Sequence, residues 1–235
     1  IDYGPYGWLE GYDKGWTPNT TDAEHKRYRF GSQGDIGLWN LLKLANALYP
    51  LIEEAEPLEE ILTNYKTTFA AKYLGMMKAK LGLTTQNTDD AKLIADLETV
   101  LAKTETDMTI FFRNLANVSK TLVVPVKDEL TFLAEVMFFW KDWMKRYVAR
   151  LQQETATDKE RKQLMNTINP KYVLRNYMAQ LAIDVANKVD YSVVDELFTV
   201  LEQPYSEQPE AQKWFAKRPE WARNKVGCSM LSCSS

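Results

Sequence analysis

The stretch Leu38-Trp39-Asn40-Leu41-Leu42-Lys43-Leu44-Ala45-Asn46-Ala47-Leu48 decides the fold class. Intervals of three or four residues, the period of an α-helix, separate five of its apolar side chains: Leu38, Leu41, Leu42, Ala45 and Leu48. Pro50 predicts the end of this helix, because proline lacks an amide hydrogen and clashes with the preceding turn. A helix is therefore expected from about residue 36 to residue 50.

The chain after Pro50 repeats this pattern. Pro57 suits the first turn of a helix, and apolar residues at helical spacing extend that helix to near Gly82. The polar connector 84–90 and the pair Thr106-Asp107 are expected to cap the helices that follow them. Further helices are expected over residues 90–101, 107–115, 128–153, 169–185 and 193–201. No strand-like alternation extends beyond a few residues, so the sequence predicts an all-α fold.

One helical domain is the simplest interpretation of the whole chain, and a subdivision near Leu83 to Asp89 is the alternative. No internal repeat, low-complexity tract or Gly/Ser-rich linker divides it. Within it we expect a long ordered loop over residues 1–36, a helical core over 37–203 and an irregular tail over 204–235, with at most a short helix around Trp214. The polar run 155–162 is predicted to be a linker or an early helical turn.

The N-terminal loop is rich in glycine, proline and aromatic residues. Its glycines and prolines interrupt any helical spacing of apolar residues, so no helix is expected there. Long loops inside compact domains are usually functional. Aromatic side chains are expected to pin it to the core: Tyr3, Tyr6, Trp8, Tyr12, Trp16, Tyr28 and Phe30.

The second half of this loop carries a small basic cluster, Lys26, Arg27 and Arg29. A solvated run of charge is the first interpretation, and contact with phosphate or substrate is the alternative. His25 is the only histidine, and no Cys, Asp or Glu stands at ligand spacing from it. We interpret it as structural or solvent-facing.

Composition narrows the class of protein. The 235 residues are 45% hydrophobic and 26% charged, with a net charge of −3, which is ordinary for a globular domain. Nothing in this balance indicates a nucleic-acid or membrane-surface partner, and no apolar run reaches the roughly 18 residues of a membrane helix. Two cysteines do not make a disulfide scaffold, so a cytoplasmic location is expected.

The first five residues, Ile1-Asp2-Tyr3-Gly4-Pro5, are the candidate for chemistry. Hard divalent ions such as Mg²⁺ take oxygen ligands, so an acid at a glycine-containing turn is a candidate metal ligand. A simple turn is the alternative, because Asp and Gly both favour turns. The tetrapeptide Ile1–Gly4 resembles the metal-binding corner of the protein-kinase fold, where the acid reaches an ion on nucleotide phosphates.

Several collinear segments resemble the selenoprotein O family of pseudokinase-fold protein adenylyltransferases. The first is Ile1-Asp2-Tyr3-Gly4-Pro5-Tyr6-Gly7 itself. The others are Trp16-Thr17-Pro18-Asn19-Thr20-Thr21-Asp22, Arg27-Tyr28-Arg29-Phe30, Ile36-Gly37-Leu38-Trp39-Asn40-Leu41, Asn169-Pro170-Lys171-Tyr172-Val173-Leu174-Arg175-Asn176-Tyr177, Pro204-Tyr205, Pro219-Glu220-Trp221-Ala222 and Cys233-Ser234-Ser235. In some members selenocysteine occupies the place of Cys233.

This resemblance implies the helical C-terminal lobe of a kinase-like fold that transfers AMP from ATP to hydroxyl side chains of partner proteins. It implies that Asp2 binds Mg²⁺ (or Mn²⁺) and contacts ATP. The family's catalytic base, its second metal ligand, its ATP-binding lysine and its glycine loop all precede this acid. No catalytic base is therefore expected within the chain, which is expected to need the N-terminal lobe of the same protein and to be inactive alone.

Two departures from the family concern redox control. Many members carry a loop cysteine that can pair with the C-terminal one, but the corresponding stretch here reads Trp16-Thr17-Pro18-Asn19, so that bridge cannot form. Ser32-Gln33-Gly34-Asp35 also differs from the usual Asn-Gln-Pro. Cys228 is then the one intramolecular partner left for Cys233, with free thiols as the default in the cytosol.

Other prominent residues are interpreted as structural. Arg113 and Arg175 lie among aromatic residues in helical segments, where an ion pair or a stack that holds helices together is expected. Tyr172 and Tyr177 are expected in the core.

Two functions of other classes remain open. One is a non-catalytic helical module for binding or regulation, and the other is an ordinary protein kinase. The position of the label that ATP leaves on a target separates adenylylation from phosphorylation.

Overall fold

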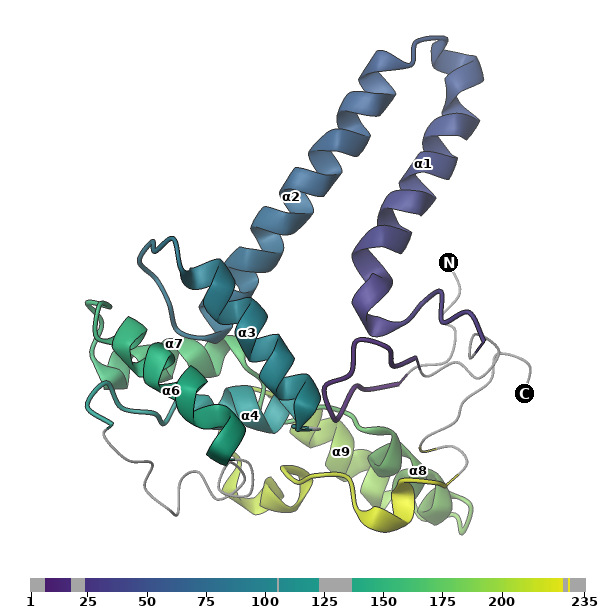
Figure 1. Cartoon of the computed structure of the whole chain (residues 1–235). Coiled ribbons are helices and arrows are strands. Elements are labelled where there is room, and N and C mark those ends of the chain that lie inside the picture. The colour runs from purple at the N-terminus through teal and green to yellow at the C-terminus, as the bar shows by residue number, and fades with distance from the viewer. Residues whose placement is uncertain (1–6, 18–23, 105, 123–136, 226–227, 229–235) are drawn as a thin grey trace.

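The computed structural model describes residues 7–17, 24–104, 106–122, 137–225 and 228, and this part of the chain is helical (Figure 1). Its helices are α1 (Gln33–Ile52), α2 (Glu56–Lys80), α3 (Asp90–Lys103), α4 (Met108–Leu115), α6 (Met137–Leu151), α7 (Asp158–Ile168), α8 (Asn176–Ala186) and α9 (Ser192–Glu202), with short 3-10 turns at Phe30–Ser32, Pro209–Trp214 and Glu220–Ala222. No strand is present in these residues, where the one extended pairing is an isolated bridge between Gly11 and Asp107. The prediction of an all-α fold is confirmed.

Helices α1 and α2 form an arm that projects from the rest of the molecule (Figure 1). The prediction that Pro50 ends α1 is wrong by a few residues, since the helix continues to Ile52 and closes at Glu53 in the left-handed conformation (φ 58°). Proline this close to the C-terminus removes one hydrogen bond in a turn that ends anyway. Pro57 lies in the first turn of α2, as predicted.

A large aromatic core holds the body together, where α3, α4 and α6 meet. The ring centroids of Phe111 and Trp140 are 5.0 Å apart, and Trp143 stacks on Tyr147 at 5.0 Å. Two of the three polar atoms on these rings are satisfied, because Trp143 Nε1 donates to the carbonyl of Leu93 at 2.9 Å and the Tyr147 hydroxyl donates to the carbonyl of Leu81 at 2.8 Å. Such partners allow large aromatic side chains to be fully buried. The third, Trp140 Nε1, is buried without a partner among the described residues.

A second core joins α8, α9 and the tail. Tyr172 and Tyr177 are 2% and 5% exposed, so both are core residues as predicted. The Tyr172 hydroxyl donates to the carbonyl of Gln208 at 2.8 Å, and Trp214 Nε1 donates to Glu196 at 2.9 Å. The short helix expected around Trp214 is a 3-10 turn that packs on this core.

Of the two interpretations of residues 155–162, the early helical turn is the correct one, since α7 begins at Asp158. The prediction of a helix that begins near Asn169 is wrong, because α7 continues to Ile168, Asn169 is its C-cap and α8 begins only at Asn176. The missed signal is a capping box: the Thr157 hydroxyl accepts from the backbone of Glu160, whose carboxylate accepts from the Thr157 amide. Few apolar residues mark this helix, since its buried side chains are Arg161 and Met165.

The predicted N-terminal cap of α4 is confirmed, whereas the side-chain cap predicted for α3 is absent. Asp107 caps α4, because its Oδ1 accepts from the amide of Ile110 at 3.0 Å. Asp89 makes no side-chain cap on α3, although the connector was expected to supply one. The helix expected over 128–153 is confirmed from Met137, and residues 123–136 lie outside the described part.

A buried charge network joins the arm's base to α3 and α6. Asp90, 2% exposed, pairs with Lys78 at 2.9 Å and with Arg150 at 2.7 Å. Arg150 also pairs with Glu154 at 2.7 Å, and the hydroxyl of Thr84 donates to Glu154 at 2.5 Å. Each charge in this group therefore has a partner, which buried charges require.

Candidate functional site

The loop over residues 7–17 lies directly on the body, fixed by backbone groups. The Tyr12 amide donates to the carbonyl of Thr106 at 3.1 Å, and the Met108 amide donates to the carbonyl of Glu10 at 3.2 Å. The Trp8 amide donates to the side chain of Asn176 at 3.4 Å. This loop follows the Ile1–Gly4 motif, so the elements α4 and α8 fix the backbone next to the candidate metal ligand.

The aromatic residues of the loop behave as predicted in part. Tyr12 is 4% exposed, and Trp8 donates its indole hydrogen to the hydroxyl of Thr109 at 3.3 Å. Tyr28 and Phe30 are 50% and 38% exposed, so they pin the loop less than expected. Tyr3 and Tyr6 lie outside the described residues, as does Asp2.

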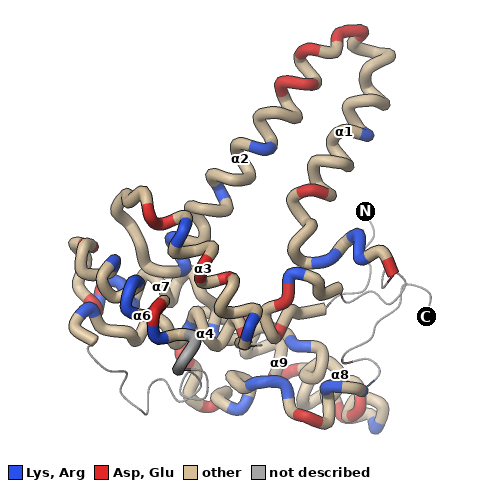
Figure 2. Tube along the Cα trace, viewed as in Figure 1, with Lys and Arg blue, Asp and Glu red and all other residues tan. Residues whose placement is uncertain are grey.

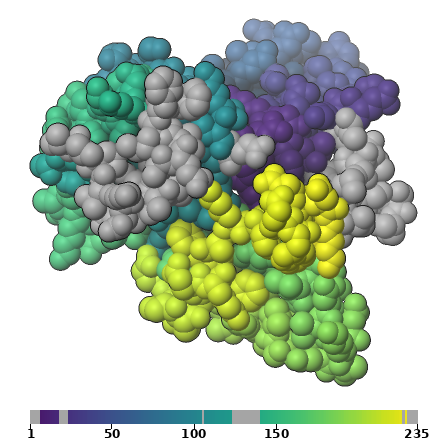
Figure 3. Space-filling model, turned by 60° about the horizontal axis from the view of Figure 1, so that its bottom comes forward, coloured from purple at the N-terminus to yellow at the C-terminus, as the bar shows by residue number. Residues whose placement is uncertain are grey.

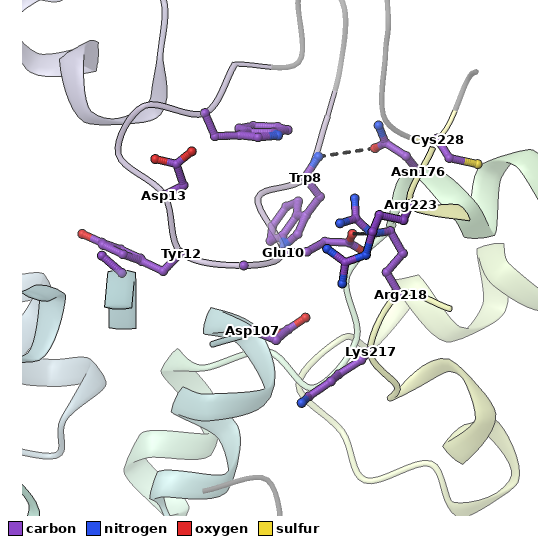
Figure 4. Close-up of a pocket in the computed structure, with 13 residues that line it drawn as sticks. Trp8, Glu10, Tyr12, Asp13, Asp107, Asn176, Lys217, Arg218, Arg223 and Cys228 are labelled. Atoms are coloured by element: carbon purple, nitrogen blue, oxygen red, sulfur yellow. Dashed lines mark hydrogen bonds and ion pairs between the residues drawn. The ribbon is translucent and has the colours of Figure 1, made fainter. Parts of the chain in front are cut away.

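A pocket of about 390 Å³ opens between this loop, the start of α4 and the tail (Figure 4). Figure 3 shows the tail beside the N-terminal loop on one face of the molecule. The residues that line the pocket come from segments far apart in sequence: Trp8, Glu10, Gly11, Tyr12, Asp13, Trp16, Ala102, Asp107, Asn176, Lys217, Arg218, Arg223 and Cys228. Its volume suits a side chain or a small ligand.

A chain of alternating charges closes one wall of the pocket. Arg175, 2% exposed, forms a two-pronged ion pair with Asp107, and its Nη1 also donates to Glu10 at 3.3 Å. Arg218 from the tail pairs with the other oxygen of Glu10 at 3.0 Å. Loop, α4, α8 and tail are thus held by one network, which confirms Arg175 as an ion-pairing residue.

The electrostatics of Glu10 reflect this position. Burial raises the pKa of Glu10, while Arg175 and Arg218 oppose that rise. The shift is upward on balance, so protonation of Glu10 becomes easier than in solvent and would release its contacts with Arg218 and Arg175.

A second anchor fixes the loop to α3, through the carboxylate of Glu98. Lys14 pairs with Glu98 at 2.7 Å, and the Tyr73 hydroxyl of α2 donates to the same carboxylate. Burial and the bond to Glu98 raise the pKa of Tyr73, so its hydroxyl stays protonated. The loop and the base of the arm therefore contact the same carboxylate of α3.

Cys228 lines the pocket as a buried thiol, 4% exposed, with no disulfide partner among the described residues. Burial raises the pKa of Cys228, which keeps it in the unreactive thiol form. Cys233 lies outside the described residues, so a bridge between the two remains a prediction.

Other residues that the sequence analysis considered do not line the pocket. His25 is exposed, as expected, and the described residues hold no group of three His, Cys, Asp or Glu side chains that could bind a metal. The guanidinium of Arg27 stacks on Trp39 at 4.0 Å from the ring centroid, and Arg29 donates to the carbonyl of Lys26 at 3.3 Å. Lys26 and Arg29 are exposed, which agrees with a solvated run of charge, and contact of the cluster with phosphate stays a prediction.

Arg113 is also structural, as predicted. It is 5% exposed, donates to the carbonyl of Asn169 at 3.0 Å and pairs with Glu207 at 2.5 Å, which ties α4 to the tail.

Sequence reasoning missed Glu10, Asp107, Lys217, Arg218 and Arg223 as pocket residues. The one signal available was the concentration of charged residues around Pro219, at Lys217, Arg218 and Glu220. Spacing could not pair Arg218 with Glu10, because the fold alone brings such distant segments together.

The comparisons with known proteins agree with one another. Residues 1–202 match the family described as "Protein adenylyltransferase SelO". Relatives named "Protein nucleotidyltransferase YdiU" are 59% identical over 244 residues in Flavobacterium johnsoniae, 48% over 242 in Aromatoleum aromaticum and 49% over 255 in Rhodopirellula baltica. Each match covers 100% of this chain and 46–47% of the relative, so the chain spans about half the length of these relatives. The chain belongs to the family described as protein adenylyltransferase SelO.

Proposed function

We propose that this chain is the helical part of a protein adenylyltransferase, which transfers AMP from ATP to Ser, Thr or Tyr hydroxyls of partner proteins. The observation that carries the proposal is the family match, which begins at residue 1 and so includes the motif Asp2-Tyr3-Gly4. The geometry supports it, because the loop that follows this motif is fixed on α4 and α8 by backbone hydrogen bonds.

Asp2 would supply one oxygen ligand to Mg²⁺ or Mn²⁺. Because the described residues contain no cluster that could hold a metal by itself, the other ligands must come from outside the described part or from the nucleotide. When bound, the metal would neutralise charge on the phosphates of ATP. The contribution of the described residues would be positioning, because Glu10, Arg175 and Asp107 hold the loop 7–17, which follows Asp2 in the sequence.

In the proposed reaction the hydroxyl oxygen of the target attacks the α-phosphorus of ATP. A bond forms between that oxygen and the phosphorus, and the bond from the α-phosphorus to the oxygen bridging to the β-phosphate breaks. Pyrophosphate leaves with the electron pair of that bond. The hydroxyl proton passes to a base, and the described residues of the pocket are not assigned this role.

The test uses a full-length chimera, in which this chain replaces the matching segment of the Flavobacterium johnsoniae relative. The chimera is incubated with a protein extract, Mg²⁺ and ATP labelled on either the α- or the γ-phosphate. We expect protein labelling from α-labelled ATP alone. Labelling from γ-labelled ATP would identify a kinase, and no labelling from either would favour a binding module.

The role of Asp2 is tested in the same chimera by Asp2→Asn. This variant keeps the side-chain shape and removes the charge, so we expect α-label transfer to fall by about 100-fold or more, in the range of lost electrostatic stabilisation. The matched control is Asp35→Asn, an exposed carboxylate in the first turn of α1. Equal activity of Asp2→Asn and the control would remove Asp2 from the mechanism.

A further inference from the structure

Helix α1 is apolar on nearly every side and yet exposed. Its 20 residues include two charged side chains, Asp35 and Lys43, and Ala45 is its one buried residue. Its large apolar side chains are 38–81% exposed at these positions: Trp39, Leu42, Leu44, Leu48, Tyr49, Leu51 and Ile52. A helix that is hydrophobic all round is normally buried, and large exposed apolar patches mark interaction sites.

The contacts of α1 with α2 cover a single side of it. The Tyr65 hydroxyl donates to the carbonyl of Gly34 at 3.1 Å, and a side chain at Gly34 would clash with the ring of Phe69. Helix α2 adds further exposed apolar side chains to the same arm, with Ile61 at 60% and Met76 at 46%. The two flanks of α1, which carry Leu44 and Leu51 on one side and residues such as Tyr49 on the other, therefore have no cover in the described part of the chain.

The charge of the arm is uneven along its length. Five glutamates surround its tip (Figure 2), at Glu53, Glu54, Glu56, Glu59 and Glu60. The lysines of the arm lie nearer to its base than these residues, at Lys43, Lys66, Lys72, Lys78 and Lys80. A partner surface that complements the arm would therefore have an apolar groove for α1 and cationic side chains opposite the glutamates of the tip.

More than half of each relative's length lies outside the match, since this chain covers 46–47% of them. A segment of that length is enough for a domain with its own core. In a single polypeptide its effective concentration at the arm is high, so an apolar contact of this kind forms without a separate partner.

We propose that the arm is the docking surface for the part of the family's polypeptide that these 235 residues do not include. That part would cover both flanks of α1 and present Lys or Arg side chains to the glutamates of the tip. This inference rests on family membership and on the exposed arm, and it holds or fails independently of the transfer reaction.

Hydrogen–deuterium exchange of α1 tests it, measured by mass spectrometry on the 235-residue chain and on the chimera with the Flavobacterium johnsoniae relative. We expect the amides of α1 to exchange at least about ten-fold more slowly in the chimera, at every protein concentration. Equal exchange in the two proteins would overturn the proposal. Protection that appears in the 235-residue chain as its concentration rises, together with dimers in sedimentation, would instead assign the face to a second copy.

Two variants of the chimera locate the contact. Leu51 is 81% exposed, so Leu51→Glu has little to disrupt in the chain alone but would place a charge in the proposed groove. Thr199→Glu adds the same charge to an exposed polar position of α9, outside the arm. We expect Leu51→Glu, and not Thr199→Glu, to restore fast exchange in α1. Retained protection in Leu51→Glu would contradict docking on that flank.

Discussion

The arm and the body of this molecule distribute their side chains in opposite ways. The arm exposes apolar residues such as Leu51, at 81%, while the body buries charged ones such as Arg175, at 2%. Every charge of the Asp90 and Asp107 networks has a partner within the described residues. The apolar flanks of α1 have no such cover there, which is why we propose a partner for the arm and none for the buried charges of the body.

The largest effect is expected for Arg175→Ala in the body. This change leaves Asp107 and Glu10 as buried carboxylates without their shared cation, and breaking a buried pair costs about 3–5 kcal/mol. Urea unfolding followed by circular dichroism measures the loss. The control is Arg146→Ala, whose pairs with Asp96 and Asp142 are 40% exposed on the arginine side and are worth less than about 1 kcal/mol. Equal losses of unfolding free energy in the two variants would mean that the buried Arg175 network stabilises the chain no more than the exposed ion pairs of Arg146.

A leucine in the core of the body comes next. Leu97 is 0% exposed, and Leu97→Ala is expected to lower the free energy of unfolding by about 2–5 kcal/mol through lost contacts and a cavity. The same urea titration applies, with the midpoint and slope both compared with the parent chain. A loss below about 1 kcal/mol would show that this core is loosely packed.

Glu154 provides a pH-dependent test of the buried network. Burial opposes its ionisation, but hydrogen bonds from Thr84 and Thr85 outweigh burial and lower the pKa of Glu154 from 4.5 to about 2. Because the folded pKa lies below the unfolded one, the carboxylate stabilises the fold fully above pH 4.5 and loses this effect between pH 4.5 and about 2. The contribution is about 3 kcal/mol at neutral pH.

The measurement for Glu154 is the difference in unfolding free energy between the parent chain and Glu154→Gln, recorded from pH 7 to pH 3. We expect the difference to shrink as the pH falls through this window. A constant difference would show that the charge of Glu154 does not contribute. Glu202→Gln serves as control, because Glu202 is an exposed carboxylate at the last residue of α9.

The smallest effect is expected in the arm. Leu51→Ala in the 235-residue chain should change the free energy of unfolding by less than about 0.5 kcal/mol, as exposed substitutions do. In the full-length chimera the same change should cost about 1–3 kcal/mol, the value of an apolar side chain that becomes buried. A large effect in the chain alone would mean that the arm is already covered there.

Periodic sequence signals predicted most of the helices. The apolar spacing of α1, α2 and α9 is visible in the sequence, and the pair Thr106-Asp107 predicts the cap that Asp107 makes with the amide of Ile110. The full extent of α7 was not predicted, because its buried side chains are few. One of them is Arg161, and a search for apolar residues at helical spacing does not include a charged residue. Its capping box at Thr157 was the stronger signal.

The candidate site was less accessible to sequence reasoning than the helices. Asp2 was found through its motif, and it lies outside the described residues. The pocket depends on contacts such as Arg218 with Glu10, which join the tail to the loop and leave no mark in local spacing. Likewise, a strongly apolar α1 suggested a core helix, and only the structure shows that its flanks are exposed.

The most direct test of the proposed function compares the 235-residue chain with the full-length chimera under one set of conditions. Both proteins are incubated with α-labelled ATP, Mg²⁺ and the same protein extract, and labelled proteins are counted after gel separation. We predict labelling by the chimera and none above background by the chain alone, because positioning of the phosphates supplies most of the catalysis in such folds. Transfer of AMP by the 235-residue chain at the rate of the chimera would contradict this account.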